Sequence, residues 1–138
     1  MTLPDDDRQA LIRLRLANAA TMLEDARCLL ERGSLRSAAN RAYYSAFYAV
    51  SALALREGKT FRTHTGLISF LHSDFVASGK LESKYGRVVQ EAFEDRSEAD
   101  YEDVPDLSRE QIAVRLGEVA DLVQAMRRIV AGHSRDSG

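Results

Sequence analysis

Residues 35–56 read LRSAANRAYYSAFYAVSALALR, and this stretch decides the fold. No charged residue lies between Arg41 and Arg56. A helix that carries no charge on nearly all of its sides is usually buried on nearly all of its sides. Ser34 stands where an N-cap is expected, and Gly58 can take the left-handed conformation that often follows a helix. The stretch therefore predicts the central helix of a helical bundle.

Apolar residues in the flanking segments recur at alternating steps of four and three, which places them in one stripe along a helix. The first such stripe consists of Ile12, Leu16, Ala19, Leu23, Ala26 and Leu30. We expect helices over residues 5–32, 35–56, 67–77, 81–100 and 109–131. The short turn at Gly33-Ser34 folds the second helix back on the first. The sequence predicts an all-α fold, an up-and-down antiparallel bundle of four long helices plus one short helix.

The composition indicates one domain over residues 1–138, with a core over about residues 5–131 and a frayed tail at residues 132–138. The formal net charge of −2 excludes a strong basic field over the whole surface, so any contact with nucleic acid needs a local patch. The single cysteine, Cys28, excludes an internal disulfide, and we expect it in the core. Without a membrane-spanning run or a signal-peptide pattern, we expect a cytoplasmic protein with no membrane contact.

One charge interrupts the apolar stripe of the fourth expected helix. Four- and three-residue steps that start at Tyr85 lead to Arg96, which therefore points inward. A charge in that position must be paired, because an unpaired buried charge is costly. Asp100 lies one turn further and can pair with it, and Tyr101 can add a hydroxyl. Two interpretations remain open, a structural salt bridge and a contact with phosphate or RNA.

A basic loop precedes the short helix. It holds Lys59, Arg62 and His64, with threonine hydroxyls between them. Backbone N–H groups at a helix N-terminus favour anions, so the loop can form a phosphate-binding corner. The alternative is a solvated loop in which Thr63 or Thr65 caps the helix.

A polar row follows one side of the central helix. Arg41, Tyr44 and Tyr48 are spaced by three and four residues, and Asn40 stands beside them. The row can belong to the core, with its hydroxyls bonded to backbone groups. It can also form a subunit interface, where tyrosine and arginine are favoured anchors.

Motifs for metals, cofactors and nucleophiles are absent from the sequence. It has no H-E-x-x-H, no G-x-G-x-x-G, no Walker loop and no G-x-S-x-G. We therefore expect no metal and no cofactor.

Four short segments stand in one order along the chain. They are NRAYYSAFYA at residues 40–49, THTG at 63–66, YG at 85–86 and RSEADY at 96–101. In this combination they resemble the HEPN superfamily, and within it the small stand-alone prokaryotic proteins. The resemblance implies an up-and-down helical bundle that commonly forms a homodimer. It also implies a possible partner, because small members often accompany a minimal nucleotidyltransferase as a toxin–antitoxin pair.

The resemblance implies one of two kinds of activity, metal-independent RNA cleavage or non-catalytic binding of RNA or nucleotides. The family's nuclease motif is an arginine followed after four to six residues by a histidine. Arg96 matches the arginine, but Tyr101, Glu102 and Asp103 occupy the positions where the histidine would stand.

We therefore predict a protein that binds RNA, a nucleotide or a partner protein around Arg96, Tyr101 and His64, in a toxin–antitoxin or nucleotidyltransferase-associated system. The other candidate binding residues are Lys59, Arg62, Asp100, Arg41, Tyr44 and Tyr48. The first alternative is an endoribonuclease with a degenerate motif, for which Arg96 and Tyr101 are the catalytic candidates. The second is a structural interaction module with an internal Arg96–Asp100 salt bridge.

Overall fold

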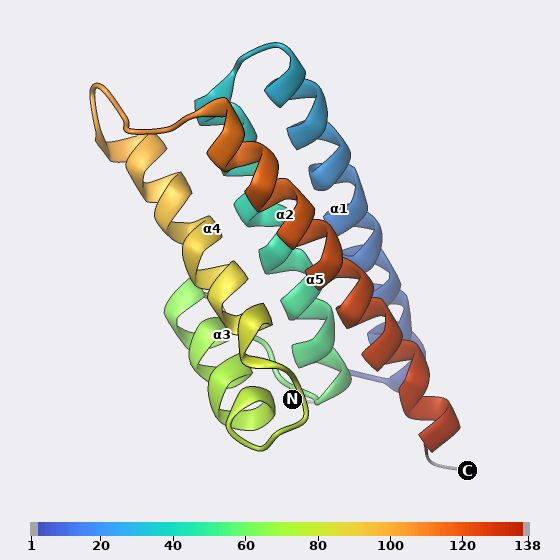
Figure 1. Cartoon of the computed structure of the whole chain (residues 1–138). Helices are drawn as coiled ribbons and strands as arrows, with labels where there is room; N and C mark the ends of the chain where they lie inside the picture. The colour runs from blue at the N-terminus through green and yellow to red at the C-terminus, as the bar shows by residue number, and fades with distance from the viewer. Residues whose placement is uncertain (1–2, 137–138) are drawn as a thin grey trace.

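The computed structural model describes the backbone of residues 3–136 and the side chains of residues 3–132. Its helices are α1 (Asp5–Glu31), α2 (Leu35–Arg56), α3 (His64–Phe70), the π-helical turn η1 (Leu71–Val76), α4 (Ser83–Tyr101) and α5 (Arg109–Asp136). Figure 1 shows the long helices running alternately up and down, with α3 and η1 beside one end of α4. Residues 3–136 contain no strand, so the all-α antiparallel bundle is confirmed.

The helix α2 is the centre of the bundle, as residues 35–56 predict. It packs against α1, α4 and α5. The stripe of alanines from Ala38 to Ala54 is buried, and small side chains let the neighbouring helices approach closely. Ser45 is also buried, and its hydroxyl donates a 2.7 Å hydrogen bond to the carbonyl of Ala19 on α1. This bond satisfies the polar group that the core takes up and ties α1 to α2.

The turns on either side of α2 follow the expected glycine positions. Gly33 and Gly58 have φ angles of +80° and +75°, so both adopt the left-handed conformation. Ser34 occupies the N-cap position of α2, but its side chain makes no capping hydrogen bond. Cys28 is exposed on α1, so its predicted place in the core is wrong. It lies off the stripe that continues through Ala26 and Leu30.

The third helix begins earlier than its apolar residues predict. It starts at His64, because the hydroxyl of Thr63 accepts a 3.1 Å hydrogen bond from the backbone N–H of Gly66. One of the two expected caps is thus present, and it moves His64 from a loop onto the first turn of a helix. The chain then continues through the π-helical turn η1.

The turn η1 fits closely against α4. A Cβ atom on the buried Gly86 would lie 2.6 Å from Cε1 of His72. A glycine at this point therefore permits the approach of the two segments.

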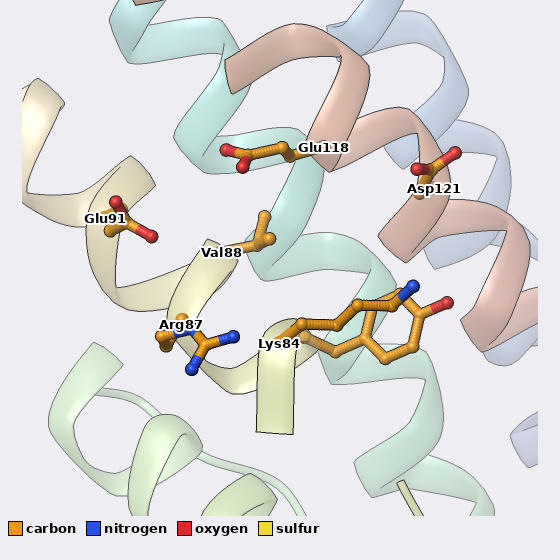
Figure 2. A pocket seen from close by; sticks show the side chains of 7 residues that line it. Lys84, Arg87, Val88, Glu91, Glu118 and Asp121 are labelled. Carbon is orange, nitrogen blue, oxygen red and sulfur yellow. The ribbon is translucent and has the colours of Figure 1, made fainter. Parts of the chain in front are cut away.

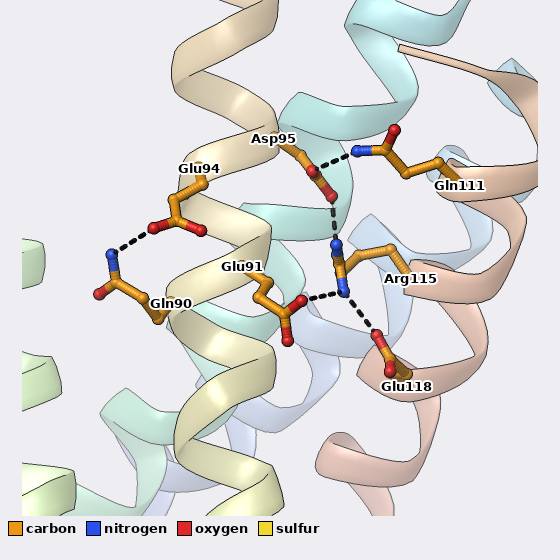
Figure 3. Close-up of polar contacts among 7 residues, drawn as sticks. All are labelled: Gln90, Glu91, Glu94, Asp95, Gln111, Arg115 and Glu118. Carbon is orange, nitrogen blue, oxygen red and sulfur yellow. Dashed lines mark hydrogen bonds and ion pairs between the residues drawn. The ribbon is translucent and has the colours of Figure 1, made fainter. Parts of the chain in front are cut away.

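A buried polar network joins α4 to α5 (Figure 3). Asp95 is 6% exposed and accepts a 2.9 Å hydrogen bond from Nε2 of Gln111 and a 2.7 Å hydrogen bond from Nε of Arg115. Nη1 of Arg115 also lies 2.7 Å from Oε1 of Glu118 and 3.3 Å from Oε2 of Glu91. Burial acts to lower the pKa of Arg115, but the hydrogen bonds and charges of its three carboxylate partners together raise it.

The helix α5 begins as predicted and ends later. The hydroxyl of Ser108 accepts a 3.0 Å hydrogen bond from the N–H of Gln111, which is the N-terminal half of the expected capping box. The helix continues past Gly132 to Asp136, so the expected end at residue 131 is wrong. Val130 packs against a small cluster formed with Ile12 of α1, which supports this last part of α5. Of the expected tail, residues 137–138 lie outside the described residues.

No helix in the described part of the chain is both long enough and apolar enough to cross a membrane.

Candidate functional site

Arg96 lies on α4 with its guanidinium against two tyrosine rings of α2. Its Cζ atom is 5.2 Å from the ring centroid of Tyr43 and 5.5 Å from that of Tyr44. These distances allow cation–π attraction to both rings. Only 25% of the Arg96 side chain is exposed. The inward direction expected from the stripe of α4 is therefore observed, and the contact with two rings is a feature that the spacing did not reveal.

Asp100 neutralises one side of the Arg96 guanidinium. Nε of Arg96 lies 3.2 Å from Oδ2 of Asp100, so the ion pair expected one turn apart is present. The buried Nε nevertheless has no hydrogen-bond partner, so the contact with Asp100 is an ion pair whose N–H is not aligned for a hydrogen bond. Among the described residues, the terminal Nη1 and Nη2 atoms of Arg96 make no hydrogen bond, and neither is one of the buried unpaired atoms. These two nitrogens are therefore free to bind an anion from outside.

Arg96, Asp100, Tyr43 and Tyr44 form a group that we call the Arg96 cluster, and His64 joins it through Phe93. Its imidazole stacks on the ring of Phe93, with 3.5 Å between the ring centroids and 17° between the ring planes. Phe93 lies one turn before Arg96 on α4, and its ring centroid is 5.6 Å from that of Tyr43. The sequence placed His64 in a separate basic loop, and only the fold brings it to Arg96. The sequence did not lead us to Phe93 as a site residue, although its spacing of three residues from Arg96 puts it on the same side of α4.

The shifted pKa values of His64 and Tyr43 favour the uncharged forms of both side chains at neutral pH. Burial lowers the pKa of His64, and the positive charge of Arg96 lowers it further. Burial raises the pKa of Tyr43 to about 12, against a smaller opposite effect of Arg96. The imidazole is therefore uncharged and able to accept a proton, whereas the phenol of Tyr43 keeps its own.

Replacing Arg96 by glutamine should raise the pKa of His64 part of the way towards 6.5. The pKa remains below that value because burial against Phe93 is the larger cause and persists in the variant. Titration of the His64 Cε1 proton by NMR measures the change. An identical midpoint in the wild type and the variant would show that the charge of Arg96 does not reach the imidazole.

The polar row of α2 continues the site along the helix. Tyr44 and Tyr48 are half-buried, their ring centroids lie 6.5 Å apart, and Cζ of Arg15 on α1 lies 5.7 Å from the Tyr48 ring centroid. Neither tyrosine hydroxyl has a hydrogen-bond partner among the described residues, and neither is among the buried unpaired atoms. The hydroxyls thus reach the surface instead of bonding to the backbone. Arg41 is exposed and donates a 3.1 Å hydrogen bond to Oδ1 of Asn40.

Three predicted site residues lie apart from Arg96. Nζ of Lys59 forms a 2.8 Å ion pair with Asp74, and Arg62 is exposed. Tyr101 is the last residue of α4 and is 80% exposed. Within the described part of the chain, it makes no hydrogen bond or ring contact with Arg96. The structure therefore brings together Arg96, Asp100, His64 and Tyr44, but not the basic loop as a whole.

A groove of about 310 Å³ opens beside this cluster, between the start of α2 and the end of α4. It is lined by Arg36, Ser37, Asn40, Arg41, Ala99 and Asp100. Arg36 connects the two helices at the groove, because its guanidinium donates 2.7 Å hydrogen bonds to the carbonyls of Ala99 and Asp103. Sequence reasoning missed Arg36. The available signal was its place at the start of α2, opposite the unsatisfied carbonyls that end an antiparallel neighbour.

A smaller pocket lies between α4 and α5, at a distance along α4 from Arg96 (Figure 2). It has a volume of about 110 Å³ and is lined by Lys84, Tyr85, Arg87, Val88, Glu91, Glu118 and Asp121. Its lining contains charges of both signs and none of the predicted site residues. Among the side chains that the structure describes, no group of three histidine, cysteine, aspartate or glutamate residues is placed to hold a metal ion.

Comparison with known proteins places this geometry in a family. A model described as the HEPN domain matches residues 12–131. The chain is 30% identical to a UPF0332 protein of Thermotoga maritima over 91% of this chain and 95% of the relative. It is 34% identical to a protein of Methanocaldococcus jannaschii, named "Putative toxin MJ0605", over 70% of this chain and 69% of the relative. The match to the HEPN domain covers the bundle and the Arg96 cluster, and the chain belongs to the HEPN family.

Proposed function

We propose that this chain is a toxin-like HEPN protein that binds RNA through phosphate groups held by Arg96. The observation that carries the proposal is the state of the Arg96 guanidinium, which lies against two tyrosine rings while its Nη1 and Nη2 atoms have no hydrogen-bond partner among the described residues. The toxin-like role is supported by two relatives whose names describe them as toxins. The homodimer and the nucleotidyltransferase partner stay predictions of the family resemblance.

The chemistry of the cluster suits a phosphodiester. Two parallel N–H groups of a guanidinium can bond to two oxygens of one phosphate, which makes arginine more specific for phosphate than the single ammonium group of lysine. Tyr44 presents a half-buried ring against Arg96, and Tyr48 lies next to Tyr44 along α2. Aromatic rings of this kind stack with unpaired bases. The net charge of −2 makes this patch, and not the whole surface, the source of attraction.

Binding of a fluorescent single-stranded RNA, followed by anisotropy, tests the proposal. Replacing Arg96 by glutamine should weaken binding by about tenfold or more, because a charge-assisted contact with phosphate is lost. The melting temperature should change little, since Asp100 is 37% exposed and remains hydrated without its partner. Arg87→Gln, an exposed change on the same helix, serves as the control for lost charge. Unchanged RNA binding together with a large loss of stability would instead support the purely structural salt bridge.

The position of His64 favours a second candidate function, cleavage of the bound RNA without a metal ion. His64 is uncharged and stands in the cluster of the phosphate-binding Arg96. It can take the proton of a ribose 2′-hydroxyl, whose oxygen then attacks the adjacent phosphorus. The bond from phosphorus to the 5′-oxygen breaks, the leaving oxygen gains a proton from water, and Arg96 balances the charge on the other phosphate oxygens. The combination of His64 as base and Arg96 as phosphate ligand predicts that RNA is cleaved even in the presence of a chelator and that the products carry 2′,3′-cyclic phosphate ends.

A further inference from the structure

The groove beside Arg96 has the size and position of a second binding subsite. Its volume of about 310 Å³ falls at the lower end of the range for small-molecule sites, roughly 300–1,000 Å³. Asp100 belongs to both places, because it lines the groove and pairs with Arg96. A ligand group in the groove is therefore a direct neighbour of an anion on the Arg96 guanidinium.

The polar atoms of the groove form a fixed set of acceptors and donors. Oδ2 of Asp100 faces Arg96, whereas Oδ1 has no hydrogen-bond partner among the described residues and remains a charged acceptor. The amide of Asn40 is oriented by the hydrogen bond that its Oδ1 accepts from Arg41, so its Nδ2 group remains a donor. Ser37 adds a hydroxyl with no partner in the described part of the chain. A bound group must therefore offer at least one N–H to Asp100 and an acceptor to Asn40.

The bases of RNA differ in how well they meet this requirement. Cytosine and adenine each carry an exocyclic amino group next to a ring nitrogen that accepts, and a carboxylate accepts readily from the amino group of cytosine. Uracil also offers an N–H and an acceptor, but its single N–H is flanked by two carbonyl oxygens, which come close to the charged oxygen of Asp100 when the N–H bonds to it. Arg36 is occupied with two carbonyl groups, so the charges that a ligand meets in the groove are the carboxylate of Asp100 and the exposed guanidinium of Arg41. The groove thus matches an amino-bearing base better than uracil.

We propose that this groove binds the base of a nucleotide whose phosphate is held by Arg96, and that Asp100 selects bases with an exocyclic amino group over uracil. This inference rests on the proposed RNA-binding function. It assigns base recognition to Asp100 and Asn40, and it leaves the phosphate contact to Arg96. The selected ligand is single-stranded, since the amino edge of a paired base is already bonded to its partner strand.

The experiment compares two fluorescent hexanucleotides, hexacytidylate and hexauridylate, for binding to the full chain. They have equal length and charge and differ in the edge of the base. The wild type should bind hexacytidylate about tenfold more tightly, which corresponds to about 1.4 kcal/mol. Asp100→Asn should reduce this ratio to about twofold or less, because an amide side chain can offer either a donor or an acceptor. Asn40→Ala should also reduce the ratio.

Glu102→Gln is the matched control, because Glu102 is an exposed acid just beyond α4 that does not line the groove. This variant should keep the wild-type ratio. The ratio, and not the absolute affinity, is the readout, since removal of any acid strengthens binding of both oligonucleotides. Equal binding of both by the wild type, still dependent on Arg96, would overturn base selection and leave the RNA-binding function standing. Binding of neither would overturn the RNA-binding function itself.

Discussion

Replacing Arg115 by methionine should lower the free energy of unfolding by about 3–5 kcal/mol. The reason is Asp95, whose side chain is 7% exposed and would lose the 2.7 Å ion pair to Nε of Arg115. Gln111 would be left as the other partner of the carboxylate, and a single amide does not replace a guanidinium. Urea denaturation followed by circular dichroism measures the loss. A loss below about 1 kcal/mol would mean that the pair behaves as a surface salt bridge.

Two further variants test whether the loss of stability comes from the unpaired charge of Asp95. Arg87→Met removes an exposed arginine from α4 and should leave stability nearly unchanged. The double variant Asp95→Leu with Arg115→Met should recover most of the lost stability, because the unpaired buried charge is then gone. Failure of the double variant to recover would show that the network between α4 and α5 is needed for more than charge compensation. Glu91 and Glu118 contribute less, since their side chains are 44% and 40% exposed.

His64→Ala should lower RNA cleavage by about 10²–10⁴-fold while RNA binding changes little. The imidazole is the only uncharged proton acceptor that the fold places in the Arg96 cluster, among the residues that the structure describes. Cleavage should also decline as the pH falls through the lowered pKa of His64, because the protonated imidazole cannot accept the 2′-hydroxyl proton. The assay follows 2′,3′-cyclic phosphate ends on a labelled RNA in the presence of a chelator.

Controls distinguish this role from a general loss of structure. His72→Ala changes a histidine of η1 outside the Arg96 cluster and should leave cleavage intact. Added imidazole should restore part of the activity of His64→Ala, since it can replace the missing base in the space that the removed side chain leaves. Arg96→Gln should reduce binding and cleavage together. Equal cleavage by the wild type and His64→Ala would refute the role of His64, and an absence of cleavage by the wild type would leave binding as the function.

The central helix and the bundle follow from the sequence because burial on several sides leaves a local pattern. Residues 35–56 carry no charge over most of their length, and α2 has these bounds. Gly58 marks its end with the expected left-handed conformation. Arg96 was identified for a related reason, since a charge on an apolar stripe is visible without any knowledge of its partners.

The composition of the site was less predictable, because it depends on contacts between helices. The stacking of His64 on Phe93 depends on α3 beginning at His64 with Thr63 as its cap, and the sequence offered Thr65 equally well as the cap. Asp95 lies on the same stripe of α4 as Ala92 and Ala99 and could have been recognised as an inward acid. Its partner on α5 could not, because the alignment of two helices along their length leaves no mark in either sequence.

Arg36 holds the end of α4 in place through hydrogen bonds to two carbonyl groups at that end. Helix ends open locally far more often than whole proteins unfold, and the last turn of α4 carries Asp100. The bonds from Arg36 to the carbonyls of Ala99 and Asp103 favour the closed form of that turn. A ligand that needs Asp100 in place binds with its intrinsic affinity reduced by the fraction of molecules in which the turn is open. With the proposed function, we therefore expect Arg36 to adjust ligand affinity through the population of the closed turn.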